Sequence, residues 1–407
     1  MRRVVYRSKG NLLLFLVALI VVSIIIPFGG DYGRVILTGM IIAFGIVLNP
    51  RVLSYHPFIL MLLFVFFQIS YSLVGKGLPF NLTVFQSLYY FSAIIVCYNF
   101  INFQDKQIII LRKLLILTLA LAFICTFFAL LTDSMVLRNN ANDADSLYVK
   151  TSTFGVFTYE FGESLAIILP ALTAYAFGEK KRIVQILLFA LTVLGIIIQV
   201  MGALATSALL SFGFSLAVLL FSFRGAKNRL RTILTLSVIG ITLLIILPSI
   251  QFQENLTLLT KMEDISESYS SGQSVGGVEE RSTLYKQSLK VCLHNPILGL
   301  GDVPEEYGKY TSNTVSLHTA FFDYWGLFGL FVVFFILSWK GSIKESLNRL
   351  NSDKKRRYRW AYLSLLGLLL FKGPVSIGLN FFVSTVFISL LILSDNNRTI
   401  KLEVKDV

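Results

Sequence analysis

Charged residues are scarce in this chain of 407 residues. They make up 14% of the sequence, whereas 55% of the residues are hydrophobic and the mean hydropathy is +0.73. A soluble domain of this composition would leave large apolar patches in water, so that class is excluded. The chain is therefore predicted to be an all-α, polytopic membrane protein.

Cysteine is also sparse, and several common signatures are missing. Cys97 and Cys125 lie inside apolar runs and only Cys292 lies in a polar stretch, which excludes a disulfide framework. No glycine motif that cradles phosphate and no convincing metal-ligand spacing occurs, so we expect no nucleotide, cofactor or metal. The first apolar run has no small-residue cleavage site and is expected to remain as an uncleaved anchor.

Long apolar runs are what the sequence has in abundance. A helical span needs about 20 apolar residues, and polar residues divide the chain into about 12 candidates. Basic residues on both flanks of the last apolar block favour two short spans that turn at Lys372-Gly373-Pro374. The candidates are 11–28, 34–48, 56–74, 82–100, 114–132, 163–177, 183–201, 203–223, 232–250, 317–338, 360–371 and 375–393.

Lysine and arginine are distributed unevenly between alternate loops. One set of loops, which includes both ends of the chain, holds 26 of the 36 basic residues. The positive-inside rule therefore predicts cytoplasmic termini in the cytoplasmic (inner) membrane and a long outward loop between spans 9 and 10. The expected organisation is membrane helices 1–9 over 1–250, an extracytoplasmic loop with short helices over 251–316, membrane helices 10–12 over 317–393, and a cytoplasmic tail over 394–407.

The net charge of +13 does not indicate a nucleic acid partner. The basic residues line the predicted cytoplasmic face, where anionic membrane lipids attract them. The outer loop at 251–316 is acidic, with nine acidic and five basic residues. Binding to nucleic acid is therefore not expected.

Two outward segments carry candidate site residues. Asp143 and Asp145 have a spacing that many glycosyltransferases use for a divalent cation, but a polar loop of this composition gives it by chance, and we assign no metal there. Glu160 and Glu163 weigh more, because a carboxylate at the mouth of a span is costly unless it faces water or a partner. Both are candidate substrate-binding residues.

The long loop changes character along its length. Serine and glycine dominate 263–277, which predicts a mobile flap, whereas 279–293 has an apolar face and acidic residues at its start, which predicts a helix. That helix would carry Arg281, Lys286 and Lys290, the basic cluster of the outer side. His318 is expected at the first turn of the next span. Asp323, a candidate substrate-binding residue, would lie about a turn and a half below it. A histidine there can accept a proton from an attacking hydroxyl.

These motifs resemble the O-antigen ligase and polymerase superfamily. The resemblance rests on Arg281, on HNPILGLGDV at 294–303 and on LHTAFFDYWGLFGL at 317–330, with weaker similarity over TFGVFTYEFGESLA at 153–166. It implies a GT-C-like glycosyltransferase in which Arg281 binds a lipid diphosphate and His318 is the catalytic base. Thr319 stands where the family usually has Asn, and Thr206-Ser207-Ala208 where it often has Arg. Arg138, Lys150, Lys286 or Lys290 would then supply the further cation.

The implied reaction transfers a polyprenyl-diphosphate-linked oligosaccharide donor to a hydroxyl of an acceptor glycan, with inversion at the anomeric carbon. We favour a polymerase that builds O-antigen or capsule polysaccharide, because the acidic outer loop offers no docking surface for an anionic lipid core. An O-antigen ligase remains the first alternative and a polysaccharide transporter or flippase the second. A peptidoglycan polymerase of the SEDS type is disfavoured, since no stretch matches its outer-loop Asp. Membrane lipids and a chain-length regulator protein complete the expected partners.

Overall fold

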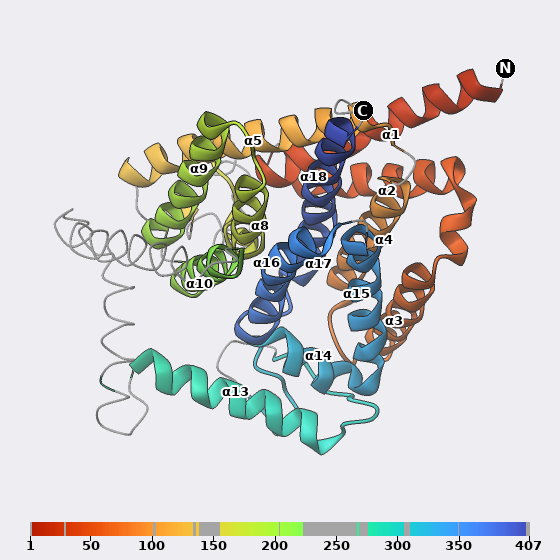
Figure 1. Cartoon of the computed structure of the whole chain (residues 1–407). Helices are drawn as coiled ribbons and strands as arrows, with labels where there is room; N and C mark the ends of the chain where they lie inside the picture. The colour runs from red at the N-terminus through yellow and green to blue at the C-terminus, as the bar shows by residue number, and fades with distance from the viewer. Residues whose placement is uncertain are drawn as a thin grey trace.

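The computed structural model describes residues 2–27, 30–100, 103–132, 136–137, 155–202, 204–222, 267, 276–304, 310–348 and 350–403. This part of the chain is a bundle of helices without a β-strand; its only β pairing is two isolated bridges, Gly77 with Asp302 and Asp302 with Thr314. The predicted all-α, multi-pass membrane protein is confirmed (Figure 1).

The first third of the chain supplies α1 to α5. Its helices are α1 (Arg2–Ile25), α2 (Gly30–Leu48), α3 (His56–Leu73), α4 (Phe80–Phe100) and α5 (Asp105–Thr132), with a short 3-10 helix η1 (Pro50–Ser54) before α3. Prolines at the start of η1 and α3 fit there because the first residues of a helix have no intrahelical partner for their amide hydrogens.

The middle of the chain contributes α8 (Tyr159–Phe177), α9 (Arg182–Met201), α10 (Ala205–Ser222) and α13 (Gly276–His294). The hydroxyl of Thr158 caps α8 by accepting a hydrogen bond from the Phe161 amide at 3.2 Å. Only Gly202 to Leu204 separate α9 from α10, so these two helices form a tight hairpin.

The C-terminal part begins with α14 (Ala320–Phe328) and the 3-10 turn η2 (Gly329–Phe331), which lead into α15 (Val332–Asn348). Then come α16 (Ser352–Phe371), α17 (Ile377–Phe382), the π-helical turn η3 (Val383–Phe387) and α18 (Ile388–Glu403). The chain breaks between Phe371 and Ile377, as the Lys372-Gly373-Pro374 sequence predicts.

Most of the predicted spans coincide with helices. Six helical segments in the described residues are long and apolar enough to cross a membrane, and three shorter apolar helices accompany them at Gly10–Ile25, Tyr32–Leu48 and Thr206–Ser222. The candidate at 232–250 and most of the predicted flap at 263–277 lie outside the described residues. The helix predicted at 279–293 is present as α13, three residues longer at its start.

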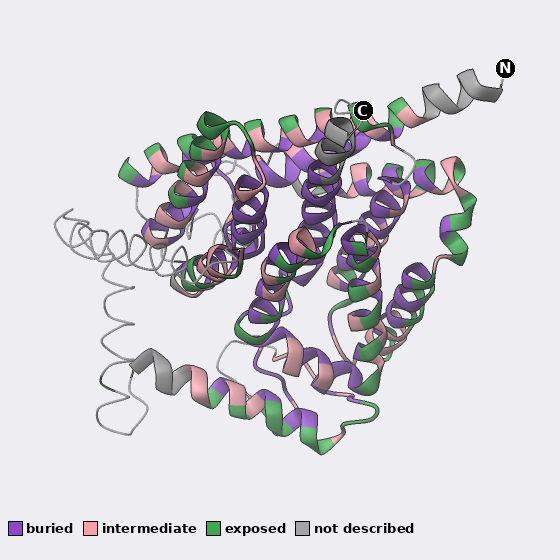
Figure 2. Ribbon diagram, in the orientation of Figure 1, coloured by how far each residue is buried: buried purple, intermediate pink, exposed green. Residues whose placement is uncertain are grey.

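The centre of the bundle is formed by α8 and by α17 with α18. Nearly every residue of α8 is buried, and the apolar segment Ile377–Asp395 is buried along its whole length (Figure 2). The peripheral helices α5 and α9 bury far less of their surface. Apolar side chains on their outward faces fit a surface in contact with lipid, where they carry no penalty.

The helix α13 lies across the side of the bundle away from both chain ends (Figure 1). The segment that follows it is fastened to the α3–α4 connection. The amine of Lys76 is 2.9 Å from both carboxylate oxygens of Asp302, and the Tyr71 hydroxyl donates to the carbonyl of Leu298 at 2.7 Å. Together with the bridge from Gly77 to Asp302, these contacts hold the polar segment on the membrane helices.

The span predicted over 317–338 is not one continuous helix. It breaks at Gly329, whose φ of 56° and ψ of −139° end α14 before α15 begins. A Cβ atom at Gly329 would lie 2.1 Å from the carbonyl oxygen of Ile297, and one at Gly299 would lie 2.4 Å from the Gly329 nitrogen. The close approach of the 297–299 backbone therefore requires glycine at both positions and explains the break.

Candidate functional site

His318 lies in a loop and not in the first turn of a span. The helix α14 begins at Ala320 with Thr319 at its N-cap, so the sequence-based placement of His318 inside the helix was wrong by two residues. Leu317, next to His318, has a φ of 63°, a conformation that costs a residue with a Cβ roughly 1–3 kcal/mol and is concentrated at functional sites. The surrounding contacts must therefore hold this segment in place.

One group of contacts comes from Asp323, which is fully buried. One of its carboxylate oxygens accepts a hydrogen bond from the Ser288 hydroxyl of α13, and the other accepts the Thr319 amide at 2.9 Å. The Ser316 hydroxyl lies 2.7 Å from the Ser288 hydroxyl and accepts the His318 amide at 3.2 Å. Asp323 thus joins α13 to the backbone on either side of His318, and its contacts are with the chain itself.

The helix α13 presents two different faces. Arg281, Leu284, Ser288 and Val291 follow helical spacing on the side that packs against α14, and Leu284, Ser288 and Val291 are buried. Lys286 and Lys290 are exposed and lie about 140° and 180° around the helix from Arg281. The structure therefore separates the predicted basic cluster, with only Arg281 on the same face as Ser288.

A second group of contacts comes from the loop between α16 and α17. The carbonyl oxygen of Lys372 accepts the amide of Ala320 at 2.6 Å, which satisfies one of the free amides at the start of α14. Gly373 packs against Leu317 so closely that a Cβ atom would lie 2.0 Å from the Leu317 carbonyl oxygen. The side-chain amide of Gln86 in α4 donates to the carbonyl of Pro374 at 2.9 Å and holds this loop from the other side.

The same loop is anchored in the core by Glu163. The amine of Lys372 is 2.6 Å from one carboxylate oxygen of Glu163, and each side chain is only 10% exposed. Ser376 donates to the other oxygen at 3.2 Å, and Asn380 and Ser164 extend the hydrogen bonds into α17 and α8. Burial and pairing account for a carboxylate at this depth, which is otherwise costly.

The remaining predicted residues are placed less closely. Glu160 is exposed in the first turn of α8, where the helix dipole favours an acidic side chain. Arg138, Lys150, Asp143 and Asp145 lie outside the described residues. Glu160 therefore lies near Glu163 at the start of α8. The two candidate cations, Arg138 and Lys150, are not placed relative to this site.

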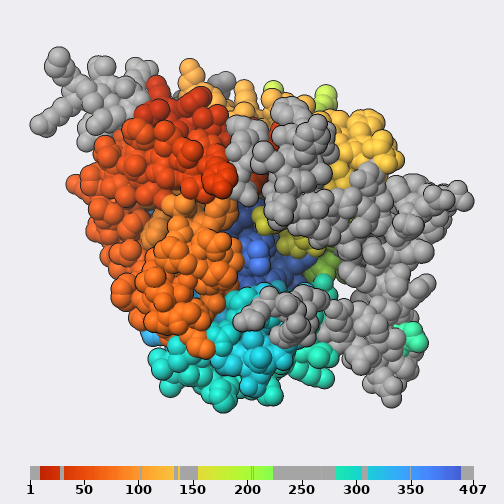
Figure 3. All heavy atoms as spheres, turned by 180° about the vertical axis from the view of Figure 1, so that it is seen from behind, coloured from red at the N-terminus to blue at the C-terminus, as the bar shows by residue number. Residues whose placement is uncertain are grey.

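The helices around these contacts enclose a hollow. Figure 3 shows the surface hollowed between α4 and the segment that leads into α14, with atoms of the C-terminal helices and of α8 on its floor. These are the elements that supply Gln86, the His318 segment, the Lys372 loop and Glu163. A concave site with a few converging polar groups is where a ligand is expected to bind.

Sequence reasoning missed Lys372 and Gln86 as parts of the site. Lys372 was interpreted only as a turn residue. It is, however, one of the few basic residues on the predicted outer side, and this unusual position could have indicated a role in the site. Gln86 lies in an apolar run, and its amide oxygen also accepts the Tyr324 hydroxyl at 2.6 Å. A buried amide with several partners cannot be recognised from its local sequence.

Comparison with known protein families gives a match over the part of the chain that contains α13 and α14. A family model described as O-antigen ligase matches residues 190–337, which include Arg281, Ser288, His318 and Asp323 but neither Glu163 nor Lys372. No curated protein matches the chain. The predicted resemblance to the O-antigen ligase and polymerase superfamily is therefore confirmed, over residues 190–337.

Proposed function

We propose that the protein is a glycosyltransferase that polymerises lipid-diphosphate-linked oligosaccharide units into a surface polysaccharide. The observation that carries the proposal is the junction of α13 and α14, where Ser288, Ser316 and Asp323 fix the Arg281 face of α13 beside the His318 segment. This junction lies inside the residues that match the O-antigen ligase family. The proposed reaction needs no nucleotide, because the diphosphate linkage of the donor already supplies the driving force.

The reaction is a direct displacement at the anomeric carbon of the donor. His318 accepts the proton of the acceptor hydroxyl, and the hydroxyl oxygen forms a bond to the anomeric carbon. The bond between that carbon and the phosphate oxygen breaks, and the electron pair leaves with the lipid diphosphate. Arg281 stabilises the departing charge through its planar guanidinium group, which can contact two phosphate oxygens. Attack from the side opposite the leaving group inverts the anomeric configuration.

Glu163, Lys372 and Asp323 act in this proposal as positioning residues. They hold the backbone on both sides of His318 and touch the loop that shapes the hollow. Five further residues are proposed to contact the substrates: Lys286, Lys290, Glu160, Arg138 and Lys150. The exposed lysines of α13 are suited to the more distant parts of a glycan or lipid headgroup.

The positioning role predicts a specific loss of turnover. Lys372→Met removes the partner of a buried carboxylate and lets the 372–376 loop move away from Leu317 and Ala320. We expect turnover per folded molecule to fall about tenfold to a hundredfold, the scale of a small displacement in an active site, while the KM for the donor changes little. Steady-state kinetics on purified protein, normalised to the folded fraction, provide the measurement.

The control lies at the other end of the same helix. Lys354 is 3.2 Å from Asp395, and the two side chains are 13% and 1% exposed, so Lys354→Met breaks a similar pair about 27 Å away along α16. Both variants should lose stability, because removing one partner of a buried ion pair costs about 3–5 kcal/mol. Equal turnover per folded molecule in the two variants would show that Lys372 is only a structural residue.

Polymerase and ligase differ in the acceptor and use the same chemistry. The acidic outer loop favours a glycan acceptor over an anionic lipid core, and the description of the matching family favours a ligase. The deciding experiment gives the purified protein a defined polyprenyl-diphosphate oligosaccharide with and without lipid A core. A ladder of longer lipid-linked glycans supports a polymerase, and transfer only to the core supports a ligase. Movement of intact donor across proteoliposomes without transfer would support a transporter and contradict both.

The proposed location is the outer face of the cytoplasmic membrane, with both termini in the cytoplasm. The basis is the excess of basic residues in the loops on the side of the termini, 26 of 36. A reporter fused after Ser271 is expected outside the cell and one fused after Ser352 inside. Reporters on the same side of the membrane would contradict this orientation.

A further inference from the structure

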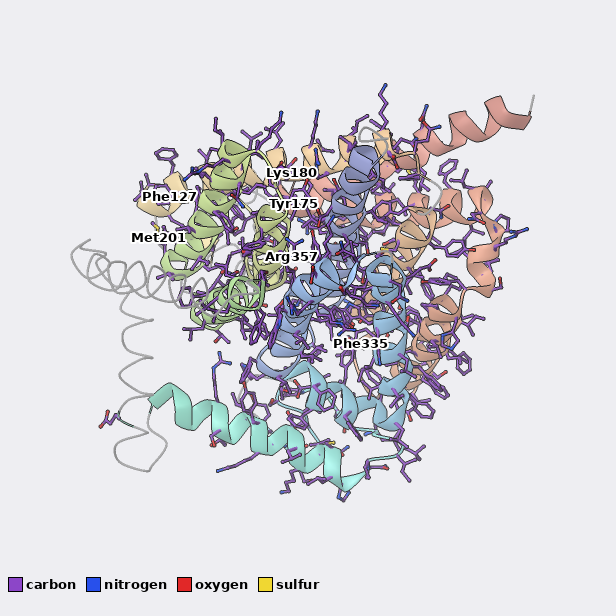
Figure 4. The ribbon with its side chains drawn as sticks, viewed as in Figure 1. Phe127, Tyr175, Lys180, Met201, Phe335 and Arg357 are labelled. Carbon is purple, nitrogen blue, oxygen red and sulfur yellow. The ribbon has the colours of Figure 1, made fainter. Side chains whose placement is uncertain are left out.

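A groove between α5, α8 and α9 is separate from the site described above. Its volume is about 790 Å³, within the range of small-molecule sites. Figure 4 labels Tyr175 and Lys180 near the C-terminal end of α8, and Phe127 and Met201 toward the C-terminal ends of α5 and α9. The groove opens on the outward side of these helices, where Leu117 and Leu187 are 59% and 63% exposed, so lipid can reach it from the bilayer.

The two ends of the groove differ in chemistry. Arg112, Lys113 and Lys181 line one end with a single acidic residue, Glu179. Apolar side chains at helical spacing line the rest, on one face of each helix. On α5 these are Ile116, Leu117, Ala120 and Ile124, and on α9 they are Val184, Leu187, Leu188, Ala190, Leu191 and Leu194.

The apolar wall of the groove is about as long as one acyl chain. From Lys113 to Ile124 the helix α5 rises about 16 Å, at 1.5 Å per residue. The hydrocarbon core of a membrane is about 30 Å thick, so one leaflet is about 15 Å deep. An acyl chain that follows the apolar wall would therefore place its headgroup at the basic end.

The basic end is organised before any ligand binds. The guanidinium group of Arg112 donates to the Tyr175 hydroxyl at 2.7 Å and to the Ser394 hydroxyl at 3.1 Å, and it lies 5.8 Å from the centre of the Tyr175 ring. These contacts use one nitrogen of the group and fix its plane. An arginine held in this way loses little freedom when its other donors bind a phosphate.

We propose that this groove binds an anionic phospholipid, with the phosphate at Arg112, Lys113 and Lys181 and one acyl chain along α5 and α9. Three basic residues against one acidic residue give the headgroup end a positive charge, which favours an anionic over a zwitterionic lipid. The proposal does not depend on the reaction that the protein catalyses. It assigns a lipid partner to the side of the bundle where α18 runs toward the end of the chain.

The test measures lipid retention on the purified full-length chain. The protein is titrated with phosphatidylglycerol or with phosphatidylcholine of the same acyl chains, and bound lipid is counted by native mass spectrometry. We expect at least fivefold tighter binding of phosphatidylglycerol. In Lys113→Gln/Lys181→Gln this preference should disappear. The matched control is Lys106→Gln/Lys180→Gln, because Lys106 and Lys180 are exposed neighbours that do not line the groove.

Three outcomes would overturn the proposal. The first is equal retention of the two lipids by the unmodified protein, and the second is the same loss of preference in the control variant. The third is displacement of phosphatidylglycerol by glycerol phosphate at equal concentration, which would mean that the acyl chain contributes nothing. A second variant, Leu187→Trp, narrows the apolar wall and leaves every charge in place. It should weaken phosphatidylglycerol binding, and unchanged binding would exclude the groove as the acyl-chain site.

Discussion

Replacing His318 by alanine is expected to lower the turnover of the purified enzyme by about a hundredfold or more, the usual scale for the loss of a general base. In the proposed mechanism the imidazole accepts the proton of the acceptor hydroxyl, so its loss should slow the chemical step and leave binding of the lipid-linked donor little changed. Single-turnover kinetics with a defined lipid-diphosphate oligosaccharide separate the two effects.

The pH dependence of the reaction provides an independent readout. A histidine base works only without its proton, so the rate should rise with pH. That rise should be absent from the residual activity of His318→Ala. Chelation by EDTA should have no effect; loss of activity restored by magnesium or manganese would instead promote Asp143 and Asp145.

His294 offers a matched control for this experiment. It also lies in the segment predicted to face outward, but it is exposed at the last residue of α13. His294→Ala should retain normal turnover and the same pH profile as the unmodified enzyme. If His318→Ala polymerises as fast as His294→Ala, the assignment of the base is wrong and Glu160 becomes the next residue to examine.

Arg281→Ala is expected to reduce polymer formation by a similar factor, about a hundredfold or more, because the proposed mechanism assigns Arg281 to stabilise the charge of the departing diphosphate. Arg281→Lys should restore little of this activity. Lysine keeps the charge but loses the planar group that contacts two phosphate oxygens at once. The measurement is polymer formed per inserted, folded protein.

Lys286→Ala is the control for Arg281→Ala. Both positions lie on α13, but Lys286 is exposed on the far side of the helix from Ser288. Its loss should change activity much less than the loss of Arg281. Full activity of Arg281→Lys would mean that only a positive charge is needed, and full activity of Arg281→Ala would remove the residue from the site.

Local sequence patterns predicted most of the helices and the helical part of the long loop. An apolar run long enough to cross a bilayer predicts a span whatever helices surround it. The acidic start and the apolar face of α13 likewise predict a helix. The turn after Phe371 was predicted from Gly373 and Pro374. Each of these features depends on residues that are close together in the chain.

The parts that the sequence could not predict depend on distant residues. The partner of Glu163 is Lys372, 209 positions later, and no periodicity connects the two. The break at Gly329 results from the close approach of the 297–299 backbone. The ion pair of Asp302 depends on Lys76, which lies in a short connection without a recognisable motif. The loop position of His318 likewise results from Asp323 and from the carbonyl of Lys372.

The full burial of Ile377–Asp395 has a consequence for how the protein is made. The segment that fills the middle of the bundle leaves the ribosome after α4, α5, α8 and α15. Until it arrives, α4, α5, α8 and α15 have no partner at their centre, and Glu163 has no lysine. The earlier helices must therefore wait in the bilayer as loosely associated spans. Assembly then completes in one late step, and a chain cut short before Lys372 would leave a set of inserted helices without a working enzyme.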